Sequence, residues 1–151
     1  SLEIENSLEG FLFPDTYQFR KGMGEDAIFR EMVSRFNDVY NDTYRKRADE
    51  LGLSQNEVIT LASIIEKETS DSSERYVIGA VFHNRLKKGI PLQSDPTVIY
   101  GIKDFNGNLT KEDLQTESPF NTYLLKGLPP QPIVFVNHWA LAFSQWTDLP
   151  Q

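Results

Sequence analysis

The run SQNEVITLASIIEKET, residues 54–69, constrains the fold more than any other stretch of this chain. Ser54 followed by Glu57 has the spacing of a capping box, in which the hydroxyl accepts from an early helix amide and the Glu carboxylate accepts from the amide of the cap residue. Apolar residues recur at helical spacing after this cap, so the pattern predicts an amphipathic helix over residues 54–69. Its apolar stripe is predicted to consist of Val58, Leu61, Ile64 and Ile65.

Glu68 is the acidic residue that this periodicity directs toward the core. It follows Ile65, Ile64 and Leu61 by three, four and seven residues, which at about 100° per residue places it in the middle of the stripe. Glu66 is expected further round the helix. Burial would raise the pKa of the Glu68 carboxyl, as a general acid requires near neutral pH.

The alternative for Glu68 is a structural carboxylate neutralised by a nearby arginine, for which Arg75 and Arg85 are available. Buried ion pairs also perturb pKa values, so periodicity leaves both alternatives open. Asn84 is a third polar side chain that could converge on Glu68.

Composition limits the classes of protein. The 151 residues, 39% of them apolar and 12% aromatic, suit one globular domain, residues 1–151. A net charge of −7 without a basic block argues against nucleic acid or an anionic membrane surface as the main partner. The absence of Cys and the isolation of the two His residues argue against a metal site. No apolar run approaches the roughly 20 residues of a membrane span, and a first residue that is Ser rather than Met suggests an excised domain.

Capping and periodicity predict the other helices. One amphipathic helix is expected over residues 25–51, with Gly52 as its stop. A second follows over residues 73–88, after a cap at Asp71 with Glu74 in the return position. Asp95 before Pro96 predicts an N-cap for a short helix over 96–100, and residues 110–116 predict another.

Two regions are expected to be extended. The aromatic block EGFLFPDTYQF, residues 9–19, contains Pro14, which favours turns and strand edges. Together with residues 100–109 it is expected to form small strands. The predicted fold class is therefore α+β, a helical core with a small β-sheet, in which Glu68 lies at the end of a helix.

Five blocks of this sequence resemble the catalytic domain of the endolytic murein transglycosylases, the YceG-like family. They are EGFLFPDTYQF, LASIIEKET, ERYVIGAVFHNRL, PLQSDPTVIYG and SPFNTYLLKGLPP, which occur in this order, and the similarity runs from about residue 9 to residue 133. The resemblance implies an enzyme that cuts peptidoglycan glycan strands internally, from a membrane-anchored position on the outer side of the bacterial cytoplasmic membrane. The family usually has an N-terminal anchor and a small LysM-like domain, neither of which is expected within residues 1–151, and Gln131 stands in place of the usual glycine.

The family's catalytic acid is the second Glu of its EKET block, which here is Glu68. The implied reaction cleaves the β-1,4 bond between N-acetylmuramic acid and N-acetylglucosamine without water, and leaves a 1,6-anhydro end. Glu68 would act as acid and then as base, with no metal or organic cofactor. Peptidoglycan strands would be the substrate, and cell-wall synthases are candidate protein partners. The expected substrate-binding residues in the matched blocks are Glu74, Asn84, Arg85, Gln93, Asp95, Asn121 and Tyr123.

The roles expected for them are amides for N-acetyl groups, Tyr123 for stacking, and Arg85 or Glu74 for positioning. Two alternatives remain. A lysozyme-type hydrolase would use Asp95 as its second carboxylate, although Asp95 also serves as the predicted helix cap. A non-catalytic glycan-binding or scaffold module that tethers cell-wall synthases would keep Glu68 in a structural salt bridge.

Overall fold

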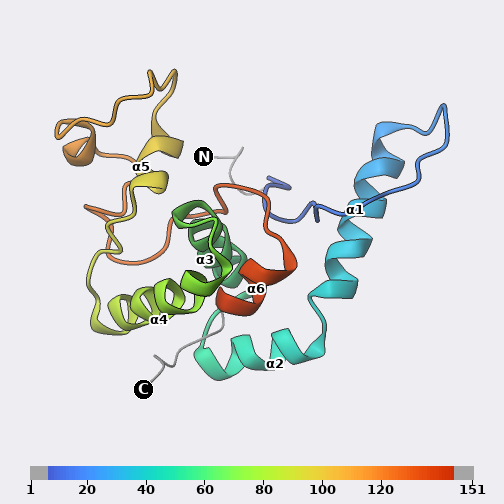
Figure 1. Ribbon diagram of the computed structural model, residues 1–151, viewed down its shortest axis with the longest axis horizontal. Coiled ribbons are helices and arrows are strands. Elements are labelled where there is room, and N and C mark those ends of the chain that lie inside the picture. The colour runs from blue at the N-terminus through green and yellow to red at the C-terminus, as the bar shows by residue number, and fades with distance from the viewer. Residues whose placement is uncertain (1–6, 145–151) are drawn as a thin grey trace.

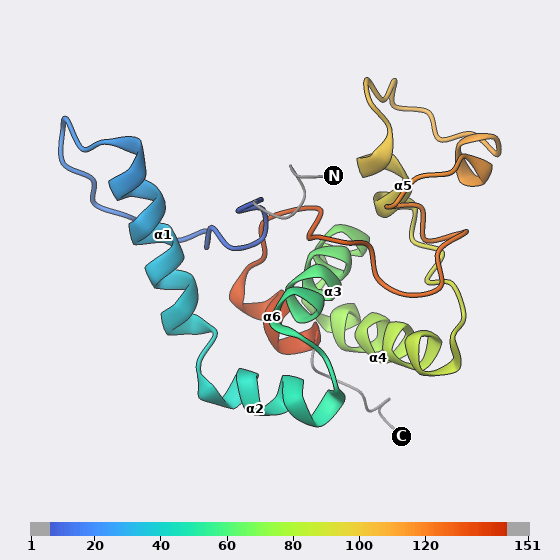
Figure 2. The ribbon, with the colours of Figure 1, turned by 180° about the vertical axis from the view of Figure 1, so that it is seen from behind.

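The computed structural model describes residues 7–144, with the exception of the side chains at positions 139, 143 and 144. Within that range the chain forms helices joined by loops. The elements are α1 (Glu25–Val39), α2 (Asp42–Leu51), α3 (Gln55–Glu68), α4 (Ser72–Lys88), α5 (Asp95–Gly101), the 3₁₀ helix η1 (Asp113–Gln115) and α6 (His138–Ser144). Helix α3 lies in the middle with α4 and α6 beside it, while α1 and α5 lie on opposite sides (Figures 1 and 2).

The predicted α+β class is wrong, because residues 7–144 contain no strand. Residues 9–19 form a turn and irregular backbone, and two of their aromatic side chains, Phe11 and Phe13, pack in the helical core. Phe13 is buried in the core, and the Tyr17 hydroxyl donates to the Phe13 carbonyl at 2.6 Å. In residues 100–109, the Asn106 side chain accepts from the amide of Asn108 at 2.9 Å. Packing against helices and local turn bonds therefore take the place of strand pairing.

Helix α3 begins as predicted and is buried on all sides through its centre. Both bonds of the Ser54–Glu57 capping box are present, at 3.2 and 2.8 Å. The four predicted stripe residues are buried, but so are the other residues of the same turns: Ile59, Thr60, Ala62 and Ser63. Whether a side chain of α3 is exposed therefore depends on how close it lies to an end of the helix, and not on which side of the helix it occupies.

The expectation that Glu68 points into the core is wrong for this reason. Glu68 is the last residue of α3 and is exposed, because the helix has left the core by its final turn. The argument that burial in apolar surroundings would suit the Glu68 carboxyl to acid catalysis is therefore not supported.

The single helix predicted over residues 25–51 is two helices, α1 and α2. The Asn41 side chain accepts from the amides of Thr43 and Tyr44 at 3.0 and 3.4 Å, which starts α2 with its own cap. Tyr40, which follows the last residue of α1, is 1% exposed, so its side chain is buried in the core at the break between the two helices. Gly52 ends α2 at φ 69°, as predicted.

The corner between α3 and α4 differs in detail from the predicted cap. Asp71 caps α4 by accepting from the amide of Ser73 at 2.8 Å, and Gly89 ends the helix at φ 64°. Glu74 does not return to the amide of Asp71. Its carboxylate accepts from the Thr69 hydroxyl at 2.8 Å, and that hydroxyl in turn accepts from the amide of Asp71 at 3.0 Å.

Helix α5 confirms the predicted short helix but not its cap. Ser94 is the N-cap residue, and Asp95 and Pro96 are the first two helical residues. The carboxylate of Asp95 binds Tyr123 instead. The short helix predicted over residues 110–116 is reduced to η1, which is preceded by reciprocal bonds between Thr110 and Asp113.

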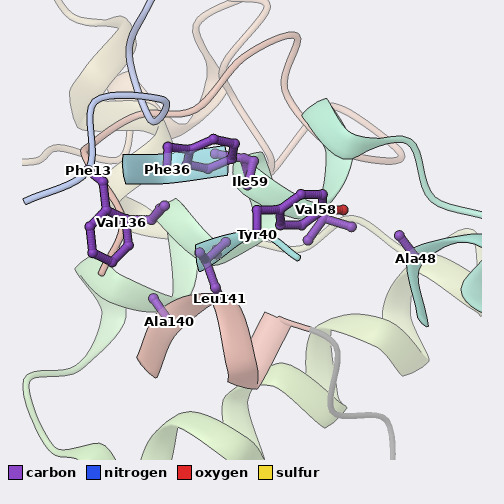
Figure 3. Close-up of a cluster of buried hydrophobic side chains, with 10 residues drawn as sticks. Phe13, Phe36, Tyr40, Ala48, Val58, Ile59, Val136, Ala140 and Leu141 are labelled. Atoms are coloured by element: carbon purple, nitrogen blue, oxygen red, sulfur yellow. The ribbon is translucent and has the colours of Figure 1, made fainter. Parts of the chain in front are cut away.

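Two hydrophobic clusters meet on α3. The first joins Phe13 of the N-terminal block to α1, α2 and the C-terminal segment (Figure 3); its members are Phe13, Phe36, Tyr40, Ala48, Val58, Ile59, Ala62, Val136, Ala140 and Leu141. The second contains Leu61, Ile64, Ile65, Phe82, Leu92, Phe120 and Ile133. Helix α3 contributes to both clusters, so the backbone that carries Glu68 is fixed from both sides. No helix within residues 7–144 is long and apolar enough to cross a bilayer.

Candidate active site

Glu68 lines an open hollow of about 230 Å³ between the end of α3, helix α4 and the loop before α5. Helix α3 stops here because Thr69 is extended, with φ −149° and ψ 140°. Among the described residues that line the hollow, Glu68 is the only acid. The full lining is Glu68, Val77, Ile78, Val81, Phe82, Arg85, Leu92 and Gln93.

The Glu68 carboxyl is held by one hydrogen bond. Its Oε1 accepts from the hydroxyl of Ser94, a residue that is 1% exposed. The site residues predicted from the sequence include the two neighbours of Ser94, Gln93 and Asp95, but not Ser94 itself. The sequence feature that could have identified Ser94 is its hydroxyl directly before Asp95 and Pro96. A hydroxyl there has the position and chemistry of a helix cap, but it can also face the acid.

Two buried threonines hold Ser94 in place. The Ser94 amide donates to Thr122 Oγ1 at 3.0 Å, and the Ser94 carbonyl accepts from Thr97 Oγ1 at 2.7 Å. The two threonine hydroxyls also bond to each other at 2.7 Å, and both threonines are 0% exposed. Ser94, Thr97 and Thr122, named here the hydroxyl seat, fix the backbone beneath Glu68.

Arg85 fixes the loop that leads into this seat. Its Nη1 donates to the carbonyls of Pro91 and Leu92 at 2.9 and 3.2 Å and to Gln93 Oε1 at 3.2 Å. Gln93 has φ 55°, a left-handed conformation that costs energy for a residue with a Cβ. The bonds from Arg85, together with the Gln93 amide donating to the Thr122 carbonyl at 3.0 Å, hold that conformation. Arg85 and Gln93 therefore lie in the hollow with Glu68.

Tyr123 and Asp95 form a pair beside the hollow. The Tyr123 hydroxyl donates to Asp95 Oδ1 at 2.5 Å. This bond raises the pKa of Tyr123 to about 12, because it holds the phenol proton; partial burial and the charges of Asp95 and Glu68 act in the same direction. Tyr123 thus lies within electrostatic reach of Glu68, although neither it nor Asp95 lines the hollow.

The structure does not bring the other three predicted residues into the hollow. Asn121 is 0% exposed, and its Nδ2 donates to the carbonyls of Leu114 and Thr116 at 3.1 and 2.8 Å, so its amide holds a loop. Asn84 lines a separate hollow between α4 and the end of α2. Glu74 is exposed at the α3–α4 corner, where it binds Thr69.

The buried arginine pairs with Glu66 rather than Glu68. Arg75 is 6% exposed, and its Nη1 lies 3.4 Å from Glu66 Oε2. The side-chain amide of Asn137 donates to Glu66 Oε1 at 3.0 Å, so this cluster links α3, α4 and the segment before α6. The structural ion pair that the sequence offered for Glu68 therefore belongs to Glu66. Within residues 7–144, no group of three or more His, Cys, Asp and Glu side chains could hold a metal ion.

Fold and site together define an all-helical domain that presents one carboxyl group, oriented by a buried serine, at the edge of an open hollow. A model of the YceG-like family matches residues 1–143. The chain belongs to this family, which confirms the resemblance seen in its sequence blocks.

Named relatives agree with this assignment. The endolytic murein transglycosylase of Bacillus subtilis (strain 168) is 40% identical over 131 residues, which are 86% of this chain and 36% of the relative. That of Streptococcus pneumoniae (strain ATCC BAA-255 / R6) is 32% identical over 146 residues, with 88% of this chain and 26% of the relative covered. The crystal structure of a yceG-like protein from Listeria monocytogenes has a TM-score of 0.83 and 36% identity, over 98% of this chain and 50% of that chain. The chain thus spans about a third or less of the length of these two curated relatives.

Proposed function

We propose that this chain is a catalytic domain that cleaves peptidoglycan glycan strands internally and without water, with Glu68 as the acid and then the base. The observation that carries the proposal is the state of the Glu68 carboxyl. It lies in an open hollow, Ser94 binds its Oε1, and no Lys or Arg of residues 7–144 forms a salt bridge with it. The names of the relatives, endolytic murein transglycosylases, support the choice of substrate.

The proposed reaction has two proton transfers through one carboxyl group. Protonated Glu68 gives its proton to the oxygen that links C1 of N-acetylmuramic acid to N-acetylglucosamine, and the C1–O bond breaks. The C6 hydroxyl oxygen of the same muramic acid then bonds to C1, and its proton passes to the Glu68 carboxylate. The product is a 1,6-anhydro end and the acid is restored. Substrate and Glu68 account for every proton and electron pair, so the proposed steps require no cofactor.

The two alternatives have less support. A hydrolase of the lysozyme type needs a second carboxyl group across the scissile bond, and the lining of the hollow contains only Glu68 among the described residues. Asp95, the candidate for that role, is bound to Tyr123. A non-catalytic scaffold would keep its carboxylate in a structural ion pair, and the buried arginine pairs with Glu66 instead.

Arg85 and Gln93 are the proposed contacts to substrate within the hollow, and the apolar side chains of Val77 and Val81 form its exposed wall. Tyr123 and Asp95 are proposed at its margin, where a sugar bound to Glu68 would extend. We also propose that the domain works from a membrane-anchored position at the outer face of the bacterial cytoplasmic membrane, near the cell-wall synthases.

The test is product analysis of peptidoglycan digested with the chain. Mass spectrometry distinguishes anhydro ends, reducing ends and no new ends. Glu68→Gln should lower the rate of anhydro-end formation by about 10² to 10⁴, the usual value of acid–base catalysis by one group. Glu112→Gln, at an exposed carboxylate outside the hollow, is the matched control and should behave as the parent chain. Reducing ends, or an active Glu68→Gln variant, would refute the proposal.

A further inference from the structure

Ser94 is at the N-cap of α5, yet its side chain makes no capping hydrogen bond. Serine is among the preferred N-cap residues because its oxygen normally accepts from an amide in the first turn. Here the hydroxyl points to Glu68 Oε1 instead. The residue that could stabilise α5 therefore contacts the acid of the proposed reaction.

The hydroxyl seat leaves the Ser94 hydroxyl proton free for that contact. A hydroxyl has one proton to donate, and Thr97 donates its proton to the Ser94 carbonyl. Thr122 then donates in the bond between the two threonine hydroxyls, while its oxygen accepts from the Ser94 amide; in the alternative arrangement Thr122 donates to the Ser94 carbonyl at 3.5 Å and Thr97 donates to Thr122. Each threonine proton is thus used within the seat, and the Ser94 hydroxyl takes part in none of these bonds.

We propose that Ser94 is the positioning residue of Glu68: its hydroxyl, fixed by Thr97 and Thr122, binds Oε1 throughout the reaction and keeps Oε2 as the oxygen that exchanges the proton. This inference rests on the proposed function. In residues 7–144, Oε2 of Glu68 has no hydrogen-bond partner, whereas Oε1 has Ser94.

One donor can serve both forms of the acid. When Oε2 carries the proton, Oε1 is the carbonyl-like oxygen and accepts from Ser94; when the carboxyl is ionised, Oε1 still accepts. Without Ser94 the terminal torsion of a glutamate is soft and roughly two-fold, so the carboxyl plane would rotate and a protonated Oε2 would turn away from the substrate. Proton transfer depends on alignment with the glycosidic oxygen, and a misplacement of about 1 Å costs roughly 10²-fold in rate.

The test compares two buried serines in the 151-residue chain. Ser94→Ala should lower kcat for anhydro-end formation about ten- to hundredfold, with KM within about threefold, because alignment is lost while the hollow is kept. Ser94→Thr, which keeps a hydroxyl, should recover most of that loss. Ser63→Ala is the control: Ser63 on α3 donates to the Thr60 carbonyl and accepts from the amide of Ile133, and its hydroxyl makes no hydrogen bond to Glu68. It should lower the melting temperature and leave kcat unchanged at temperatures where it is folded.

A double variant separates positioning from general loss of structure. In the Glu68→Gln background, Ser94→Ala should change the residual rate by less than about twofold, because the group on which Ser94 acts is already gone. If Ser94→Ala does not fold, Ser94→Cys, with a similar size and a weak donor, takes its place in both backgrounds.

The outcomes distinguish the two proposals. A parent-like kcat in the Ser94 variant, an equal kcat loss in Ser63→Ala, or a full additional loss in the double variant would overturn the positioning role. An active Glu68→Gln variant, or a parent chain that makes no anhydro ends, would overturn the proposed function instead.

Discussion

Replacing Glu66 and Glu68 separately by Gln should give opposite results for stability and activity, because the two carboxylates have different partners. Glu66 faces the buried guanidinium of Arg75, and removing one member of a buried ion pair costs about 3 to 5 kcal/mol. Three features reduce that cost here: the Glu66 side chain is 21% exposed, the N–O distance is a long 3.4 Å, and a Gln oxygen can still accept from Asn137.

We therefore expect Glu66→Gln to lower the free energy of unfolding by about 2 kcal/mol. In a domain of this size that corresponds to a melting temperature roughly 4 to 8 °C lower. Glu68 is exposed and its Gln replacement can still accept from Ser94, so Glu68→Gln should stay within about 0.5 kcal/mol of the parent chain. Activity should show the reverse order, with Glu66→Gln within about tenfold of the parent at a temperature where it is folded and Glu68→Gln far below it.

Thermal melting followed by circular dichroism and the anhydro-end assay measure both quantities on the same samples. The double variant Glu66→Leu/Arg75→Met should lose less melting temperature than the two single variants lose together, because it leaves no unpaired buried charge. A Glu66→Gln variant that melts with the parent, or a Glu68→Gln variant that melts several degrees lower, would refute the assignment of the ion pair to Glu66.

Three further predictions follow from local features. Burial raises the pKa of Tyr100 to about 12, and the hydrogen bond to a carboxylate raises that of Tyr123 to about 12, whereas both are about 10 in the unfolded chain. Between these values the folded chain keeps protons that the unfolded chain releases, so the free energy of unfolding should fall from about pH 10 to pH 12. Urea titrations measure this, and a flat profile would contradict it. Gly10→Ala should lower the free energy of unfolding by about 1 to 3 kcal/mol, since φ is 84° and a Cβ would lie 2.6 Å from Pro132. A melting temperature equal to that of the parent chain would exclude that clash. Asn41→Ala should cost about 1 kcal/mol through the lost cap of α2, and an unchanged urea midpoint would show that the cap does not hold the helix break.

Helix ends were predictable where the signal is local. The Ser54–Glu57 box and the glycine at position 52 act within one turn, and both are as expected. The break at Asn41 was missed because apolar spacing continues across it. The strands were also mispredicted, since an aromatic block gives the same pattern whether it pairs with a strand or packs on helices, as Phe13 does.

The candidate site was predictable only in part. Glu68, Arg85 and Gln93 were named from sequence and do line one hollow. The face argument for Glu68 failed because periodicity separates a buried side from an exposed side only for a helix that has both, and α3 is buried all round. Ser94 was missed because its contact with Glu68 spans 26 residues. Asn121 carries a sugar-binding type of side chain, but its amide is committed to a loop.

The first hydrophobic cluster has a consequence for how the chain folds. It joins Phe13, near the start of the chain, to Val136, Ala140 and Leu141, near its end, across the α3 residues Val58 and Ile59. A chain synthesised from its N-terminus can form α1 to α4 early, but this side of α3 stays exposed until Leu141 has been synthesised. Contacts of such long sequence separation slow folding. Until then, exposed apolar surface makes the incomplete chain prone to aggregation. Chains shortened before Val136 should therefore collect as insoluble protein, even though the hollow that holds Glu68 lies entirely upstream of the cut.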